Sequence, residues 1–206
     1  MDECSRLYAG NSEYLKILES VTPDIYVEVT VPSENSFSAD NQQERPGIDE
    51  WIVGFSDGEG CFSISIVRNR VCRLGWQVQH EYSVTQSAGS LEALELIREF
   101  FDCGTIIPNR RRDNHNDLML RFSVKRRVDL VNVVIPFFID HPLRTAKQTD
   151  FARFRQVLSL MAEGRHLSSS GLAEIATITE SMNRRQRSRY LESSEAIRRL
   201  SHIDMR

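Results

Sequence analysis

An apolar stretch, two glycines four positions apart and two carboxylates are packed into residues 51–60, which run directly into an alternating strand pattern at 61–66. On a helix, Gly54 and Gly58 would lie one turn apart and leave a strip of bare backbone. Each glycine costs a helix roughly 1 kcal/mol relative to alanine. Close approach of a second backbone can offset that cost. The segment therefore favours a helix that packs against another helix.

The acidic end of this segment predicts a site for a divalent cation. A helix over 48–58 that packs against its twin would bring Asp57 and Glu59 of each copy together. Hard cations such as Mg²⁺ prefer carboxylate oxygens. The alternative is an ordinary helix end, because glycine terminates helices and aspartate favours turns.

The hydrophobic periodicity predicts an α+β fold in which helices cover one face of an antiparallel sheet. The expected elements are a helix at 48–58, strands at 61–70 and 76–86, a helix at 91–101, strands at 104–112 and 117–124, and helices at 127–138, 146–163 and 168–182. Ser90 is the expected N-cap of the helix at 91–101.

The chain divides into three predicted parts. Residues 1–47 form an acidic extension with a linker rich in polar residues, 48–185 form the domain, and 186–206 form a helical tail. The net charge is −3, but the first part holds three basic against nine acidic residues. The strand regions 61–86 and 104–127 hold ten Lys or Arg against three acids. A basic sheet attracts phosphates whatever the total charge.

Composition excludes several classes of protein. Four cysteines with no CxxC spacing favour reduced thiols over a disulfide framework or a zinc site. There is no apolar run long enough to span a bilayer, and the acidic start is unlike a targeting peptide. We expect a protein that is not secreted and does not bind membranes, either cytoplasmic in a bacterium or encoded in an organelle.

Residues 52–60 resemble the signature of the LAGLIDADG homing endonucleases. Gly54, Asp57 and Gly60 match the motif, and Glu59 stands where the family has its metal-binding acid. The resemblance implies an αββαββα fold with a saddle-shaped antiparallel sheet and helices on one face.

Two further segments, 82–86 and 141–151, are similar to the family, and residues 48–185 look like one repeat. We find no second copy of the motif, which implies a homodimer. The dimer interface residues implied are Ile52, Gly54, Phe55 and Gly58.

The resemblance also implies roles for residues of the active site. Glu59 would bind Mg²⁺, with Mn²⁺ as a substitute, and the backbone carbonyl of Gly58 would lie close by. Gln86 matches a position that holds an attacking water. Lys147 matches the active-site lysine of the family, with Arg144 as the competing assignment.

Double-stranded DNA is the implied partner, and polar residues on the strands are the candidates for binding it. Strand alternation separates them from apolar residues on the opposite face. They are Ser63, Ser65, Asn69, Arg70, Gln77, Gln79, Ser83, Arg110, Arg111, Arg112, Arg121, Ser123 and Lys125. His80 falls on the apolar side, where we expect a core histidine.

The function implied is that of an intron-encoded, site-specific endonuclease. It would make a double-strand break in a long pseudo-palindromic DNA site by metal-dependent phosphodiester hydrolysis. Two alternatives remain open at this point: a maturase of the same fold that binds intron RNA, and a non-catalytic DNA-binding protein. Retention of Glu59, Gly58, Gln86 and a candidate lysine favours the endonuclease.

Overall fold

The computed structural model describes residues 47–109, 118–182 and 188–193. The predictions for the acidic extension and for Arg110, Arg111 and Arg112 fall outside these ranges. The elements are α3 (Ile48–Glu59), β1 (Gly60–Arg68), β2 (Trp76–Ser87), η1 (Ala88–Ser90), α4 (Leu91–Phe101), β3 (Thr105–Pro108), β4 (Met119–Val124), α5 (Arg127–Asp129), η2 (Leu130–Val134), α6 (Ile135–Asp140), α7 (Lys147–Ala162), η3 (Arg165–Leu167) and α8 (Ser169–Glu180).

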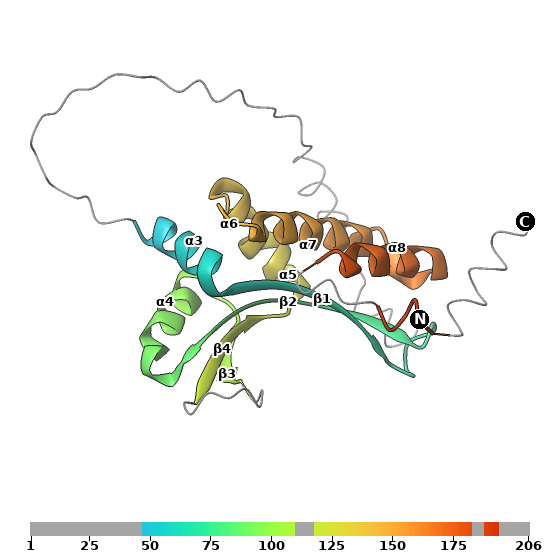
Figure 1. Ribbon diagram of the computed structural model, residues 1–206, viewed down its shortest axis with the longest axis horizontal. Helices are drawn as coiled ribbons and strands as arrows, with labels where there is room; N and C mark the ends of the chain where they lie inside the picture. Colours follow the sequence, from blue (N-terminus) through green and yellow to red (C-terminus); the bar gives the residue numbers. More distant parts are fainter. Residues whose placement is uncertain (1–46, 110–117, 183–187, 194–206) are drawn as a thin grey trace, which may run out of the picture.

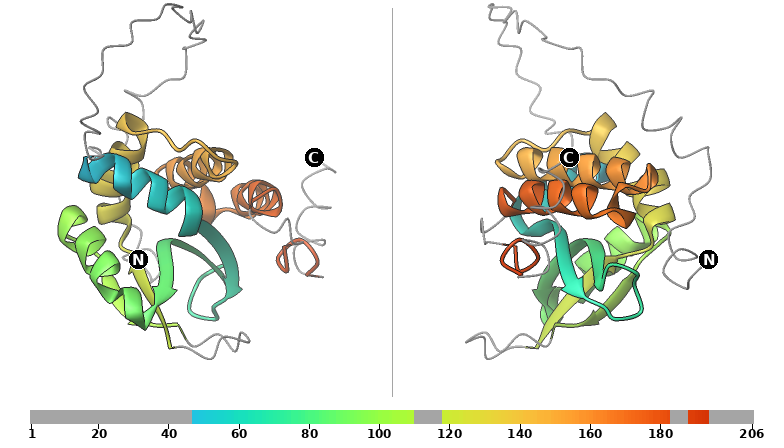
Figure 2. Two further views of the ribbon diagram at one scale, coloured as in Figure 1. Left: turned by 60° about the vertical axis from the view of Figure 1, so that its left-hand side comes forward. Right: turned by 90° about the vertical axis from the view of Figure 1, so that its right-hand side faces the viewer.

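The four strands form one antiparallel sheet in the order β1-β2-β4-β3. The sheet is curved, and the helices lie on its convex side (Figure 1). Helices α7 and α8 lie side by side over β1, whereas α3, α4 and α6 gather at one end of the sheet (Figure 2). The predicted α+β architecture is confirmed.

One hydrophobic core fills the space between the sheet and the helices. Strand alternation builds its floor, because Phe62, Tyr82 and Phe122 are at most 1% exposed and share the helix-facing side. Phe62 contacts the rings of Phe138 and Phe154 from the helix layer at 5.3 and 5.5 Å. Among the described elements, no helix lies against the opposite face of the sheet, which these elements leave open to a partner (Figure 1).

The predicted single helix at 127–138 is instead built from three consecutive pieces, α5, η2 and α6, and reaches Asp140. The middle piece, η2, is a π-helical turn, and Pro136 lies in the first turn of α6. Proline has no N–H and its ring clashes with the carbonyl four residues earlier, so a wider turn relieves the conflict. The periodicity alone could not reveal this change of pitch.

Ser90 is the N-cap residue of α4, as predicted, although its side chain makes no cap hydrogen bond. Two other local predictions are corrected. Strand β1 ends at Arg68, so Asn69 and Arg70 lie in the turn before β2. The described part of the predicted C-terminal helical tail, 188–193, forms turns instead.

Segment 188–193 packs on the core because of one aromatic residue. Tyr190 is 3% exposed, meets the Trp76 ring edge-on at 5.5 Å, and donates a hydrogen bond to the Ser169 carbonyl. Residues 188–193 therefore pack against the described domain.

Cys61 and Cys103 are reduced thiols that form no disulfide within the described ranges. Within the described ranges, no helix is long and apolar enough to cross a bilayer.

Candidate active site

Helix α3 is fixed to the sheet by a buried pair of hydroxyl groups. Ser56 and Tyr82 are both fully buried, and their oxygens lie 2.7 Å apart. Burial raises the pKa of Tyr82 well above its usual range, although the Ser56 hydrogen bond lowers it. Both groups therefore stay neutral and hydrogen-bonded, as buried polar groups must. This contact holds the C-terminal end of α3 against β2.

The passage from α3 into β1 has no loop, and Gly60 makes that possible. A Cβ atom at this residue would lie 2.6 Å from the Ser56 carbonyl oxygen, closer than real Cβ contacts allow. Glu59, the last residue of α3, is consequently joined directly to the first residue of the sheet. The sequence motif therefore specifies both the acid, Glu59, and the direct connection from α3 to β1.

Asp57 binds the loop that precedes α7, more than eighty residues away in the chain. Its Oδ2 accepts a hydrogen bond from the Arg144 backbone N–H at 2.7 Å. Its Oδ1 accepts bonds from the backbone N–H and the hydroxyl of Thr145, at 3.2 and 2.8 Å. Asp57 therefore positions the start of α7 and is not free to act as a second metal-binding acid.

Lys147, the first residue of α7, reaches the end of α3. Its Nζ donates to the carbonyls of Asp57 and Gly58, at 2.7 and 2.8 Å. These are carbonyls of the last turn of a helix, where a cation is favoured by the unpaired C=O groups and by the dipole. Arg144, the competing assignment, contributes its backbone N–H to Asp57. The geometry therefore brings Lys147, in preference to Arg144, beside Glu59.

Glu59 and Gly58 are both exposed at this helix end. Their carboxylate and carbonyl oxygens are of the kind that Mg²⁺ prefers. Among the described residues, no three His, Cys, Asp or Glu side chains gather where they could hold a metal. The residues present fit a hard divalent cation, and one copy of the chain supplies only part of the oxygen ligands such an ion takes.

Gln86 lies near the same place. The register pairs Gly60 with Val84, so Gln86 lies two residues further along β2, at the level of the end of α3. Its backbone partner on the other side is Leu120 of β4. Gln86 is half-buried and shares the alternation of Tyr82 and Val84, on the helix side of the sheet. Three of the residues predicted from the sequence, Glu59, Lys147 and Gln86, are thus brought to one end of the sheet.

One side of α3 is open to a partner. A Cβ atom at Gly54 or Gly58 would meet no described residue within 4 Å. Trp51 and Phe55 flank this strip and stack on each other at 4.9 Å with an angle of 13° between the rings. Ile52 is fully buried in the core of its own subunit, so we remove it from the predicted dimer interface. The open face consists of Trp51, Gly54, Phe55 and Gly58.

The candidate DNA-binding residues differ in how far they are free to meet a base. Ser65 and Gln79 are exposed and opposite each other on β1 and β2, as expected of base readers. Ser83 and Ser123 are 7% and 3% exposed, which leaves little hydroxyl surface for a base. Asn69 donates a hydrogen bond to Gln77 at 2.9 Å, so these two candidates hold each other.

The sequence interpretation missed Glu81. Its Oε1 accepts a hydrogen bond from the Ser123 hydroxyl at 2.5 Å, and it lies 3.7 Å from Arg121 Nε and 3.8 Å from Lys125 Nζ. The sequence did contain a signal for this cluster, because Glu81 is the only acid among the polar residues on its face of β2. The sequence interpretation counted it only as a charge opposing the basic residues.

Comparisons with known proteins agree with this geometry. A protein from Neurospora crassa named "Probable intron-encoded endonuclease 2" is 34% identical over 65% of this chain and 28% of its own length. The chain spans about a quarter of the length of the first curated relatives it matches. The homing endonuclease I-TnaI, known from a crystal structure, is 36% identical over 75% of this chain and 97% of its own, with a TM-score of 0.60.

A crystal structure of I-SmaMI, described as a LAGLIDADG homing endonuclease bound to cleaved DNA, is 28% identical over 77% of this chain and 49% of its own, with a TM-score of 0.62. Another structure shows I-SmaMI bound to an uncleaved DNA target in the presence of calcium ions. The sequence model described as LAGLIDADG endonuclease matches residues 52–158, more than half of the 206 residues. The chain therefore belongs to the LAGLIDADG endonuclease family.

Proposed function

We propose that this chain is a site-specific DNA endonuclease that acts as a homodimer, uses a divalent metal, and is intron-encoded. One observation carries the proposal: the Lys147 ammonium lies against the helix end that presents the Glu59 carboxylate. A cation and an acid at one point, above an open sheet with basic side chains, suit the hydrolysis of a phosphodiester.

The residues of the site have separable tasks. Bound Mg²⁺, or Mn²⁺ in its place, would supply Lewis-acid activation of water and of the phosphate. Glu59 and the Gly58 carbonyl would hold it from this chain. An ammonium has three donors, of which Lys147 uses two on carbonyls, so one remains for a phosphate oxygen. Gln86 would orient the attacking water.

The homodimer is supported by the lengths of the relatives. The chain matches 97% of I-TnaI but only 49% of I-SmaMI, as expected if I-SmaMI holds two such units in one chain and this protein holds one. A pair related by a two-fold axis along the open face of α3 would place two Glu59 side chains near each other. Each subunit would follow about one turn of DNA, giving a pseudo-palindromic site of roughly 20 bp.

The test uses the purified chain and a randomised duplex pool. The protein first selects its preferred duplex in Ca²⁺, and cleavage of that duplex is then measured with Mg²⁺. Glu59→Gln removes the metal-binding charge at little cost in volume, so we expect selection to persist and cleavage to be lost.

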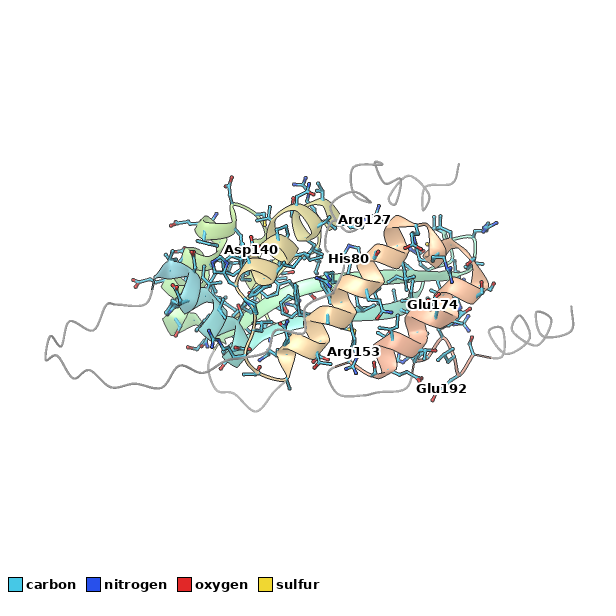
Figure 3. The ribbon with its side chains drawn as sticks, turned by 90° about the horizontal axis from the view of Figure 1, so that it is seen from above. His80, Arg127, Asp140, Arg153, Glu174 and Glu192 are labelled. Atoms are coloured by element: carbon cyan, nitrogen blue, oxygen red, sulfur yellow. The ribbon has the colours of Figure 1, made fainter. Side chains whose placement is uncertain are left out.

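Three outcomes would overturn the proposal. They are wild-type cleavage rates in Glu59→Gln, failure of the wild-type protein to select any DNA sequence, and binding of intron RNA with no cleavage of DNA. Glu192→Gln, the same kind of change at an exposed position at the end of the molecule opposite α3 (Figure 3), serves as the matched control and should cleave normally.

A further inference from the structure

Glu81 is the only acidic residue in the four described strands. It lies in the middle of β2, opposite Ser63 of β1, on the face that no helix covers. A carboxylate on a surface that meets phosphates repels them, unless cations neutralise it. An isolated acid at the centre of this face therefore needs a role that outweighs the repulsion.

The contacts of Glu81 show what neutralises it. Ser123, Arg121 and Lys125 all approach the same carboxylate oxygen, Oε1. The Glu81 side chain is 18% exposed and that of Arg121 is 26% exposed, so this ion pair is shielded more than a surface pair. Two cations and one acid leave the cluster with a net positive charge. The cluster as a whole can therefore lie against DNA phosphates, although the Glu81 carboxylate alone would repel them.

Arg121 is held in a particular way. The register pairs it with Thr85, four residues along β2 from Glu81, so its side chain extends along the strand toward the acid. Its Nε is buried, lies 3.7 Å from Glu81, and has no hydrogen-bond partner among the described residues. An arginine whose contact with the acid is an ion pair on its Nε side keeps its two terminal amino groups for a ligand. Those two groups make the bidentate contact with guanine O6 and N7.

We infer that Glu81 is a specificity-determining positioning residue: it orients Arg121 toward a guanine edge and keeps Arg121 and Lys125 from binding phosphates of any sequence. The inference rests on the proposed DNA binding. It adds that the base contacted by Arg121 is a guanine and that Glu81 holds Arg121 in position for this contact. Without Glu81, the two cations would be free to follow the backbone. Affinity for random DNA would rise while discrimination would fall.

The experiment compares Glu81→Gln, Glu81→Asp and wild type on two duplexes, the one selected by the wild type and a random one, over a series of KCl concentrations in Ca²⁺. Gln keeps the shape and the bond from Ser123 but loses the charge. We expect Glu81→Gln to lower the ratio of specific to random affinity by about tenfold. Its salt dependence on random DNA should steepen by up to about one unit of slope, because freed cations displace more counterions. Glu81→Asp keeps the charge and should restore part of the ratio.

Two controls separate this role from a structural one. Glu174→Gln removes an equal charge from an ion pair with Arg165 in the helix layer and should leave both affinities unchanged. In an Arg121→Ala background, Glu81→Gln should add no further loss of discrimination, because coupled neighbours are not additive. A repeated selection with Glu81→Gln should relax the same base pair that Arg121→Ala relaxes.

The failures are distinguishable. If the wild type selects no sequence, the proposed function falls and this inference with it. If the wild type selects a site, and folded Glu81→Gln and Glu81→Asp both keep the wild-type ratio and salt slope, the role of Glu81 is refuted while the proposed function stands.

Discussion

The Lys147 ammonium is the side chain that connects the two segments of the candidate site. Its position depends on Asp57, which fixes the loop just before it through Arg144 and Thr145. Hydrogen bonds to a carboxylate are worth roughly 1.5–3 kcal/mol, more than neutral ones. The aspartate of the motif therefore acts on the site indirectly, by determining where α7 begins.

Lys147→Gln should lower the cleavage rate while leaving selection of the duplex intact. Glutamine retains two donors but no charge, so the phosphate would lose an electrostatic contact that matters most in the transition state. The expected loss is roughly 10²- to 10³-fold in single-turnover cleavage. Arg144→Gln is the matched control, because the contact of that residue with the site is made by its backbone. Equal losses in the two variants would show that the lysine has been assigned to the wrong residue.

At the scale of the elements, the packing of β2 against the helix layer encloses two histidines that the site does not use. His80 of β2 is half-buried and His166 of η3 is buried, and His80 and Arg127 both lie next to α7 when the molecule is seen from the helix side (Figure 3). Burial, and secondly the Arg127 charge, together lower the pKa of each histidine from 6.5 to about 4. The folded protein therefore keeps both rings neutral.

These histidines predict a loss of stability in acid. The unfolded chain binds protons near pH 6.5 and the folded chain only near pH 4, so the free energy of unfolding should fall as the pH drops through that window. One pKa unit corresponds to about 1.4 kcal/mol, so the His80 contribution is on the order of 3 kcal/mol. Denaturant unfolding at a series of pH values measures it. His80→Gln should flatten the slope between pH 6.5 and 4, and an unchanged slope would contradict the assignment.

Local patterns were enough to predict most elements and which face of β1 and β2 is apolar, because alternation and periodicity depend on near neighbours. They also predicted His80 as a core residue. Contacts between distant residues were not predictable in this way. The bonds from Asp57 and Lys147 join residues 87 to 90 positions apart, and the cluster around Glu81 depends on the β2–β4 register. Likewise, only the packed helix shows that Ile52 faces inward while Gly54 faces out.

At the scale of the whole molecule, α3 has a face against which no other described residue packs at its two glycines. A stacked aromatic pair and two open glycines lie together on α3. Apolar surface of this kind favours association, and the absence of side chains at the glycines lets two backbones approach. The proposed dimer would cover this face, so its assembly can be tested separately from the fold of each subunit.

Gly54→Leu should give a folded monomer. No described residue lies within 4 Å of a Cβ atom at this position, so the subunit can accept the side chain, whereas a partner helix in close contact cannot. Light scattering would measure the mass and circular dichroism the fold. Ala152→Leu, an equivalent addition on the exposed side of α7, should remain dimeric. A Gly54→Leu monomer that still cuts both strands would refute the dimeric site.

The absence of a loop between α3 and β1 has a consequence for how such a protein can change its target. Glu59 and β1 are consecutive in the chain, and Gly60 leaves no loop between them. In the proposed function, the spacing from the scissile phosphate to the bases that β1 reads would then be set by covalent geometry. Substitutions along β1 would alter which bases are preferred, but the cut would stay at the same offset. A change of target sequence would therefore leave the cleavage position unchanged.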